Sequence, residues 1–94
     1  MALNHPITQW QGRSVWLIGA SSGIGLATAK ALHAAGARVT VSARKTDLLD
    51  AFVASHSGSQ AIALDVCDTQ AVHAVTQQVA QSHGIDVVVY CSGY

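Results

Sequence analysis

The first chemical signal in this sequence is a cluster of three glycines with the spacing G-x-x-x-G-x-G. The cluster follows an apolar run, Val15 to Ile18, and precedes a run of helix-forming residues. Strand, glycine turn and helix in this order bring free backbone N–H groups and the positive end of a helix dipole to one place, which suits a phosphate. The serines of the turn could donate to the same phosphate. The candidate binding residues of the turn are Gly19, Ser21, Ser22, Gly23, Ile24 and Gly25.

Two basic residues, Arg44 and Lys45, follow the next apolar run, Val39 to Ser42, and no carboxylate comes before Asp47. A dinucleotide site that prefers NAD places a carboxylate here for the ribose hydroxyls. Guanidinium and ammonium groups instead suit a phosphate, and one charge-assisted hydrogen bond of about 1.5–3 kcal/mol gives roughly a ten- to hundredfold preference. We therefore predict NADP rather than NAD, with the 2′-phosphate on Arg44 and Lys45.

The alternative for this basic pair is two solvated charges at the start of a helix. Cations are unfavourable at a helix N-terminus unless an anion joins them, which favours the phosphate.

The glycine spacing differs from the common dinucleotide fingerprint G-x-G-x-x-G and resembles the first turn of the short-chain dehydrogenase/reductase family, Thr-Gly-x-x-x-Gly-x-Gly. Ile18 stands where that family usually has threonine. The resemblance covers nearly the whole chain from Arg13 onward, but only the N-terminal part of a family member. It implies an oxidoreductase that moves a hydride between NADP(H) and a carbonyl or alcohol substrate.

Two further positions match the family. Asp65 and Val66 resemble its Asp-Val/Leu pair, which implies contact with the adenine through the carboxylate and a backbone amide; a cap or turn role for Asp65 is the alternative. Residues 90–93, Tyr-Cys-Ser-Gly, fall where the family has Asn-Asn-Ala-Gly. Gly93 is retained and Ser92 is a near match, which implies that these two border the cofactor ribose.

The catalytic pair of the family, Tyr-x-x-x-Lys, is absent from the sequence. Tyr90 and Tyr94 are the only tyrosines, and neither is followed by such a lysine. We therefore assign no catalytic residue and expect a truncated cofactor-binding portion that is inactive alone. A non-catalytic dinucleotide-binding or sensing module is the alternative. A methyltransferase-like relative is disfavoured, because its cofactor ribose also needs an acidic residue where Arg44 stands.

Apolar runs alternate with helical patterns along the chain, which predicts parallel strands joined by right-handed crossovers. We expect a partial Rossmann-type doubly wound α/β fold with strand order 3-2-1-4, the first two helices on one face and the third on the other. A ligand crevice would open at the carboxyl ends of the first and fourth strands. The predicted strands are Ser14–Ile18, Val39–Ser42, Ala61–Asp65 and Ile85–Tyr90, and the predicted helices run from Gly23 or Ile24 to Ala35, from Lys45 or Thr46 to His56, and from Asp68 or Thr69 to His83.

Helical periodicity predicts which face of each helix is buried. Gly36 is the expected left-handed C-cap of the first helix, Asp68 or Thr69 can cap the third, and Trp10 is expected over the start of the sheet. The predicted apolar stripes are Ile24, Ala27, Thr28, Ala31, Leu32 and Ala35 in the first helix, Leu48, Leu49, Phe52 and Val53 in the second, and Val72, Val75 and Val79 in the third.

Length and composition bound the remaining possibilities. The 94 residues fit one domain, with 1–13 as a lead-in and 14–94 as the N-terminal, truncated part of an NAD(P)-binding domain. Lys and Arg together equal Asp and Glu, only 11% of residues are charged, and no apolar run approaches a membrane span, so nothing favours nucleic acid or membrane as a partner. The outer edge of Val87 to Val89 would be unpaired, which predicts self-association.

The cysteines and histidines give no sign of a disulfide framework or a metal site. Cys67 and Cys91 are too few for such a framework, so we interpret them as small buried hydrophobes in a reducing, cytoplasmic protein without a secretory signal. The five histidines show no H-x-x-x-H spacing, and we expect most of them at the surface.

Overall fold

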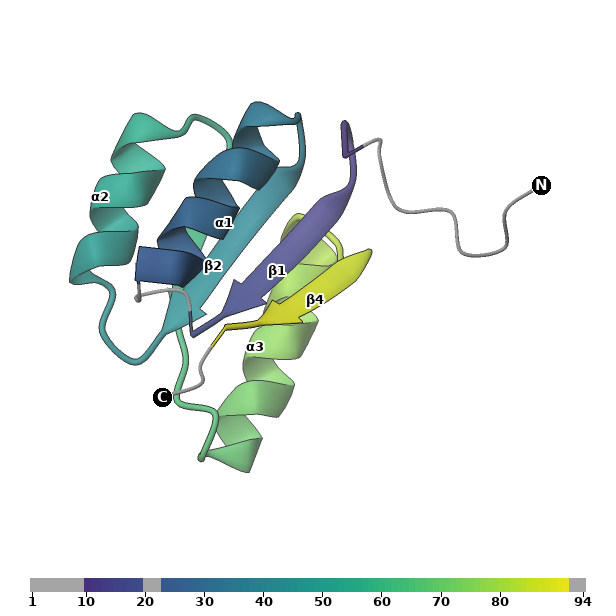
Figure 1. The fold of residues 1–94 in the computed structure, drawn as a ribbon. Coiled ribbons are helices and arrows are strands. Elements are labelled where there is room, and N and C mark those ends of the chain that lie inside the picture. The colour runs from purple at the N-terminus through teal and green to yellow at the C-terminus, as the bar shows by residue number, and fades with distance from the viewer. Residues whose placement is uncertain (1–9, 20–22, 92–94) are drawn as a thin grey trace.

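The chain folds, in a computed structural model, into a four-stranded parallel sheet with helices on both faces (Figure 1). The structure describes residues 10–19 and 23–91. The elements in chain order are β1 (Ser14–Ile18), α1 (Gly23–Ala34), β2 (Arg38–Ala43), α2 (Asp47–Ser55), β3 (Gln60–Ala63), α3 (Thr69–Ser82) and β4 (Val87–Tyr90). The sheet order β3-β2-β1-β4 confirms the prediction of a partial Rossmann-type α/β fold.

The register of the sheet brings the carboxyl ends of the strands to one edge. Ile18, the last residue of β1, lies opposite Ser42 of β2 and Tyr90 of β4. Val39 and Val41 of β2 are fully buried, as expected for a parallel strand that is covered on both faces. This common edge is where ligands bind in open α/β sheets.

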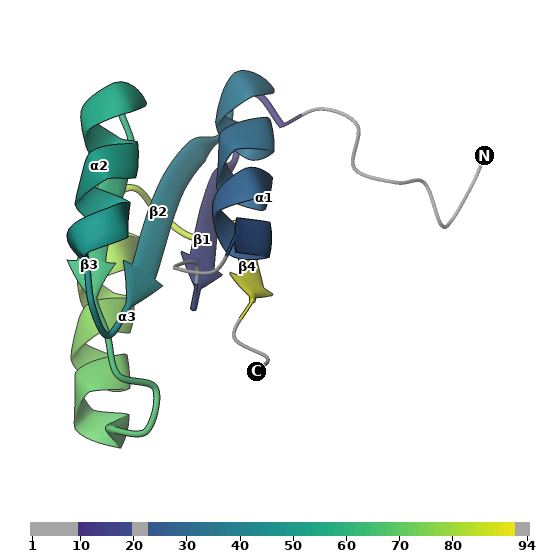
Figure 2. The ribbon, with the colours of Figure 1, turned by 60° about the vertical axis from the view of Figure 1, so that its left-hand side comes forward.

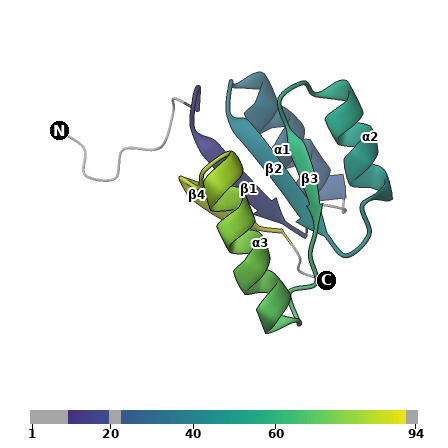
Figure 3. The same ribbon diagram turned by 180° about the vertical axis from the view of Figure 1, so that it is seen from behind.

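Two apolar cores lie on opposite faces of the sheet, as predicted. Figure 2 shows α1 and α2 together on one face, and Figure 3 shows α3 on the other. The larger core joins β1, β2, α1 and α2 and contains Val15, Leu17, Ala29, Leu32, Val39, Val41, Leu49 and Phe52. The smaller core joins the other face to α3 and contains Trp16, Leu64, Val75 and Val79.

The predicted buried face of α1 is wrong. Of the six residues in that stripe, only Leu32 is buried, and Ile24 is 80% exposed. Gly25 and Ala29 face the sheet instead. Alanine and other small residues occur on every side of this helix, so periodicity does not separate its faces. The structure buries the side with the smallest residues, which allows α1 to lie close to the sheet.

The faces of the other two helices follow the predictions with one exception. Leu49 and Phe52 of α2 are buried, whereas Leu48 is 58% exposed and does not belong to the stripe. Val75 and Val79 of α3 are buried as expected. The error at Leu48 arises because two adjacent residues on a helix point about 100° apart, so only one of a neighbouring pair can face the sheet centre.

The predicted caps are confirmed at both positions. Gly36 ends the α1 segment with a φ of +95°, which only glycine adopts without strain. Asp68 caps α3 by accepting a hydrogen bond from the N–H of Ala71 at 3.1 Å. Trp10 is half-buried against the larger core, as expected.

Two predicted strands are shorter than the apolar runs indicated. β3 ends at Ala63, because the Asp65 carboxylate accepts the N–H of Cys67 at 2.9 Å and closes a turn. β4 begins at Val87 rather than Ile85, because the carboxylate of Asp86 accepts the N–H of Ser14 at 2.8 Å before the ladder starts.

Candidate functional site

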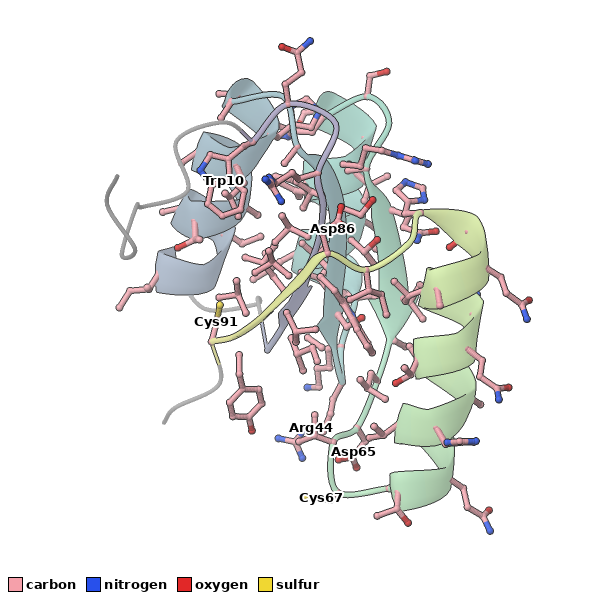
Figure 4. All side chains as sticks on the ribbon, turned by 90° about the vertical axis from the view of Figure 1, so that its right-hand side faces the viewer. Trp10, Arg44, Asp65, Cys67, Asp86 and Cys91 are labelled. Carbon is pink, nitrogen blue, oxygen red and sulfur yellow. The ribbon has the colours of Figure 1, made fainter. Side chains whose placement is uncertain are left out.

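The candidate site lies at the carboxyl edge of the sheet, where β1 has β2 on one side and β4 on the other. The order of the strands along the chain reverses at this point, since β2 and β3 lie on one side of β1 and β4 lies on the other, and in open α/β sheets ligands bind at such a position. Figure 4 shows Arg44 and Asp65 at this edge. The exits of β2 and β3 are joined by a hydrogen bond from the Leu64 N–H to the Ala43 carbonyl at 2.9 Å.

The glycine turn begins directly after β1. Gly19 has a φ of +79°, and its N–H donates to the carbonyl of Ser42 at 2.7 Å, so the turn is fixed to the end of β2. Gly23 begins α1, and a Cβ added there would meet no atom of the described residues within 4 Å, so these residues leave room for close approach to the backbone. Gly25, in the first turn of α1, is buried. The predicted contacts of Ser21 and Ser22 lie outside the described residues.

Ile24 is the most exposed large apolar residue of the described chain, at 80%, and it stands in the first turn of α1. An apolar side chain at this position offers surface that a bound molecule could cover, with a gain of about 25 cal/mol per Å² buried. Ile24 was predicted both in the buried stripe of the first helix and among the binding residues of the glycine turn. Its exposure contradicts the first prediction and is compatible with the second.

The basic pair is exposed and accessible at the same edge. Arg44 and Lys45 are both exposed, and within the described part of the chain neither side chain has a hydrogen-bond or ion-pair partner. The helix α2 begins only at Asp47, and its first turn contains Asp47 and Asp50. These carboxylates already complement the helix dipole, so the dipole does not exclude the alternative of two solvated charges. The feature that favours a phosphate is that these donors lie at the carboxyl edge of the sheet without a partner among the described residues.

Asp65 and Val66 lie in the turn that follows β3. The Asp65 carboxylate accepts the Cys67 N–H, and its carbonyl accepts the N–H of Asp68 at 3.0 Å, so the turn role considered for Asp65 is present in the structure. Both Asp65 and Val66 are exposed. The turn occupies one carboxylate oxygen, and the other has no hydrogen bond among the described residues, so adenine contact remains a prediction.

The end of β4 lies at the same edge of the sheet, on the other side of β1. The N–H of Cys91 donates to the Ile18 carbonyl at 2.8 Å, which ties the exit of β4 to that of β1. Tyr90 is 61% exposed. The predicted ribose contacts, Ser92 and Gly93, lie outside the described residues.

The two cysteines differ from the interpretation drawn from the sequence. Cys67 is an exposed free thiol, so its interpretation as a buried hydrophobe is wrong; it belongs to the exposed turn after Asp65 rather than to a strand. Cys91 is half-buried against the larger core, and this burial raises the pKa of its thiol.

Sequence reasoning missed Ser42, which lies between the glycine turn and the basic pair. Ser42 is fully buried, and its hydroxyl accepts a hydrogen bond from the indole N–H of Trp16 at 2.9 Å. The available signal was a serine inside an apolar strand, since a buried hydroxyl requires a partner.

Metal chemistry has no support among the described residues, which contain no group of three or more His, Cys, Asp or Glu side chains able to hold an ion. None of the four histidines in this part of the chain is buried, in agreement with the expectation of mostly surface histidines: His73 is exposed, and the other three are half-buried. His33 and His56 pack around Phe52, with the Phe52 and His56 rings stacked 4.1 Å apart, so apolar contact explains their partial burial.

In the described ranges, no helix has the length and apolar character needed to cross a membrane.

Comparison with known proteins gives a consistent result. Residues 13–94 match the family described as short chain dehydrogenase. The chain is 34% identical over 90 residues to an uncharacterized oxidoreductase of Staphylococcus haemolyticus, covering 93% of this chain and 39% of that protein. It is 42% identical over 60 residues to the L-xylulose reductase of Bos taurus, covering 64% of this chain and 25% of the reductase.

Among solved structures, the chain is similar to an actinorhodin polyketide ketoreductase variant crystallised with NADPH, with a TM-score of 0.78 and 29% identity. The match covers 93% of this chain and 35% of the ketoreductase. The chain therefore spans between a quarter and two fifths of the length of these proteins.

Proposed function

The chain belongs to the short-chain dehydrogenase/reductase family, and we propose that it forms the NADP(H)-binding portion of such an oxidoreductase. Residues 14–94 would be the N-terminal part of the NAD(P)-binding domain, and residues 1–13 a lead-in to it. In the intact protein this portion would hold NADP(H) for hydride transfer to or from a carbonyl or alcohol substrate. The observation that carries the proposal is the exposed pair Arg44 and Lys45, which have no side-chain partner in the described part of the chain and follow Ser42, the residue whose carbonyl accepts the N–H of Gly19.

The residues present fit the cofactor in kind and in place. The glycine turn and the first turn of α1 would take the pyrophosphate, because a helix N-terminus directs backbone N–H groups and a positive dipole end at an anion, and the backbone has an open face at Gly23. Arg44 and Lys45 would take the 2′-phosphate, and Asp65 and Val66 the adenine. Ser92 and Gly93 would border the nicotinamide ribose. When bound, the nicotinamide supplies or accepts the hydride; the chain's own residues bind and orient it.

The similar proteins support the choice of cofactor and reaction class. The ketoreductase with a TM-score of 0.78 was crystallised with NADPH. The L-xylulose reductase is a reductase by name.

A non-catalytic dinucleotide-binding or sensing module is the second candidate. Within the 94 residues Tyr90 does not begin a Tyr-x-x-x-Lys segment, because the residue four positions later is Tyr94. NADPH oxidation by the 94-residue chain with any carbonyl should therefore stay at background. The two functions separate on whether the encoding frame continues past Tyr94 into such a segment.

Calorimetric titration of the purified chain with NADPH and NADH tests the proposal. We expect NADPH to bind at least about tenfold more tightly than NADH, because the 2′-phosphate adds a charge-assisted hydrogen bond. Binding of neither nucleotide, or equal binding of both, would contradict it.

The proposed setting is a reducing, cytoplasmic one, without nucleic acid or membrane as a partner. Both free cysteines, Cys67 and Cys91, are compatible with this setting. Self-association through β4 is the one further partner we propose, since Val88 and Tyr90 are large exposed apolar or aromatic residues on this edge strand.

A further inference from the structure

We propose that Ser42 and Trp16 form a positioning pair that holds the glycine turn and Arg44 in register, and so sets the preference for NADPH over NADH. This inference rests on the proposed function. Neither residue is expected to touch the cofactor, because Ser42 is 0% exposed and Trp16 is 3% exposed. Their effect would pass through the backbone.

Ser42 makes two hydrogen bonds that reach β1 and the turn after it. Its hydroxyl accepts the indole N–H of Trp16 at 2.9 Å, and its carbonyl accepts the N–H of Gly19 at 2.7 Å. The first bond fixes the end of β2 against the middle of β1, and the second fixes the start of the glycine turn against the end of β2. Ser42 thus connects the start of the glycine turn, through its backbone, to Trp16 in β1, through its side chain.

The same residue lies two positions before Arg44. Ala43, between them, is buried and its carbonyl accepts the N–H of Leu64 at 2.9 Å, so the chain from Ser42 to Arg44 has little freedom. The Arg44 side chain has no partner of its own in the described part of the chain. Its guanidinium is therefore placed mainly by the path of the backbone as it leaves β2.

A buried serine at this position needs a reason, because β2 could be apolar on both faces. The residues of β2 on the α1 and α2 face are apolar, whereas Thr40 and Ser42 on the α3 face are polar and buried. Thr40 accepts a hydrogen bond from the Gln60 side-chain amide at 3.0 Å, farther from the glycine turn. Thr40 is a buried hydroxyl on the same strand and face, and it serves as the matched control.

The two nucleotides separate a positioning role from a merely structural one. NADPH and NADH share the contacts at the glycine turn, and only NADPH would use Arg44. A variant that lowers the folded fraction weakens both affinities by the same factor, so the ratio of their dissociation constants does not change. A shift of Arg44 relative to the turn weakens NADPH more than NADH.

The experiment measures both dissociation constants for the full chain and for Ser42→Ala, Trp16→Phe, the double variant and Thr40→Val. For each variant we take the dissociation constant of NADH divided by that of NADPH. We expect this ratio to fall about three- to tenfold in Ser42→Ala and in Trp16→Phe, as partial loss of a charge-assisted hydrogen bond would give. The double variant should fall no further than the worse single variant, because both changes remove one interaction. Thr40→Val should keep the wild-type ratio.

Each other outcome overturns the inference. An unchanged ratio in Ser42→Ala and Trp16→Phe, with the wild type still selective for NADPH, refutes the positioning role and leaves the proposed function intact. An equal fall in Thr40→Val refutes it as well. A wild-type chain that binds neither nucleotide refutes the proposed function and this inference together. Thermal unfolding by circular dichroism identifies any variant that does not fold; Trp16→Phe retains an aromatic ring and carries the test if Ser42→Ala fails to fold.

Discussion

Arg44 is the residue on which the cofactor assignment depends. It is exposed and unpartnered within the described chain, and its position follows directly from the end of β2. The sequence alone was sufficient to propose it, because the order of strand, cation and next helix is a local feature. Ser42 was not identified, because its importance comes from a contact with Trp16, 26 positions earlier in the chain.

Replacing Arg44 by Asp should reverse the preference between the two cofactors. A carboxylate would repel the 2′-phosphate and could accept hydrogen bonds from the ribose hydroxyls of NAD. We expect NADP affinity to fall by about ten- to a hundredfold, the equivalent of about 1.5–3 kcal/mol. Calorimetry with both nucleotides measures this.

Arg38→Asp is the control for this substitution. Arg38 is exposed and begins β2, at the amino-terminal edge of the strands. Its replacement by Asp therefore makes the same change of charge away from the site. Equal loss of NADP affinity in both variants would mean that only overall charge matters.

The two cysteines should differ in reactivity. Cys67 is exposed, whereas burial raises the pKa of the Cys91 thiol and keeps it neutral to higher pH. Iodoacetamide should therefore label Cys67 first, as mass spectrometry of a time course can measure. Since a raised folded-state pKa disfavours the thiolate, the contribution of Cys91 to stability should decrease as the pH rises through its titration range. Faster labelling of Cys91 would contradict its placement against the core.

Among the elements, α1 is where sequence and structure differ most. The existence of the helix, its start at Gly23 and its end before Gly36 followed from local signals. Its buried face did not, because a helix with small residues on all sides carries no clear periodicity, and tertiary packing selected Gly25 and Ala29. In α3 the valines stand among polar residues, so the periodicity is clear, and the predicted burial of Val75 and Val79 is confirmed.

Enlarging Ala29 tests the corrected face of α1. Ala29 is 0% exposed, so Ala29→Leu should lower the free energy of unfolding by about 1–3 kcal/mol through overpacking. Ala27→Leu, on the exposed side of the same helix, should change it by less than about 0.5 kcal/mol. Urea unfolding followed by circular dichroism gives both values. A larger loss from the substitution at Ala27 would restore the face expected from the sequence.

In the whole molecule, the parallel sheet could be predicted because each strand, crossover and cap is encoded locally, and right-handed crossovers leave few alternatives. The strand order and the placement of the helices on the two faces agree with that prediction. In the described chain, β4 has a neighbouring strand on one side only. Val88 is 52% exposed, and β4 is an edge strand without a charged residue.

Self-association should therefore depend on β4. Val88→Lys places a charge on this edge and should reduce the sedimentation coefficient of the chain toward that of a monomer. Leu48→Lys, an equivalent change at a residue of α2 that is 58% exposed, should leave association unchanged. A wild-type chain that sediments as a monomer throughout a concentration series would remove the basis for this expectation.

The central claim is that one nucleotide spans the carboxyl edge of the sheet, with its pyrophosphate at the glycine turn and its 2′-phosphate at Arg44. The most direct measurement is an NMR titration of the ¹⁵N-labelled chain with NADP, followed at the backbone amides. We predict the largest shifts at Gly19, Gly23, Gly25 and Arg44, with NAD reproducing the shifts at the glycines but not at Arg44. Shifts confined to the opposite edge of the sheet, or no shift at the glycines, would contradict the account.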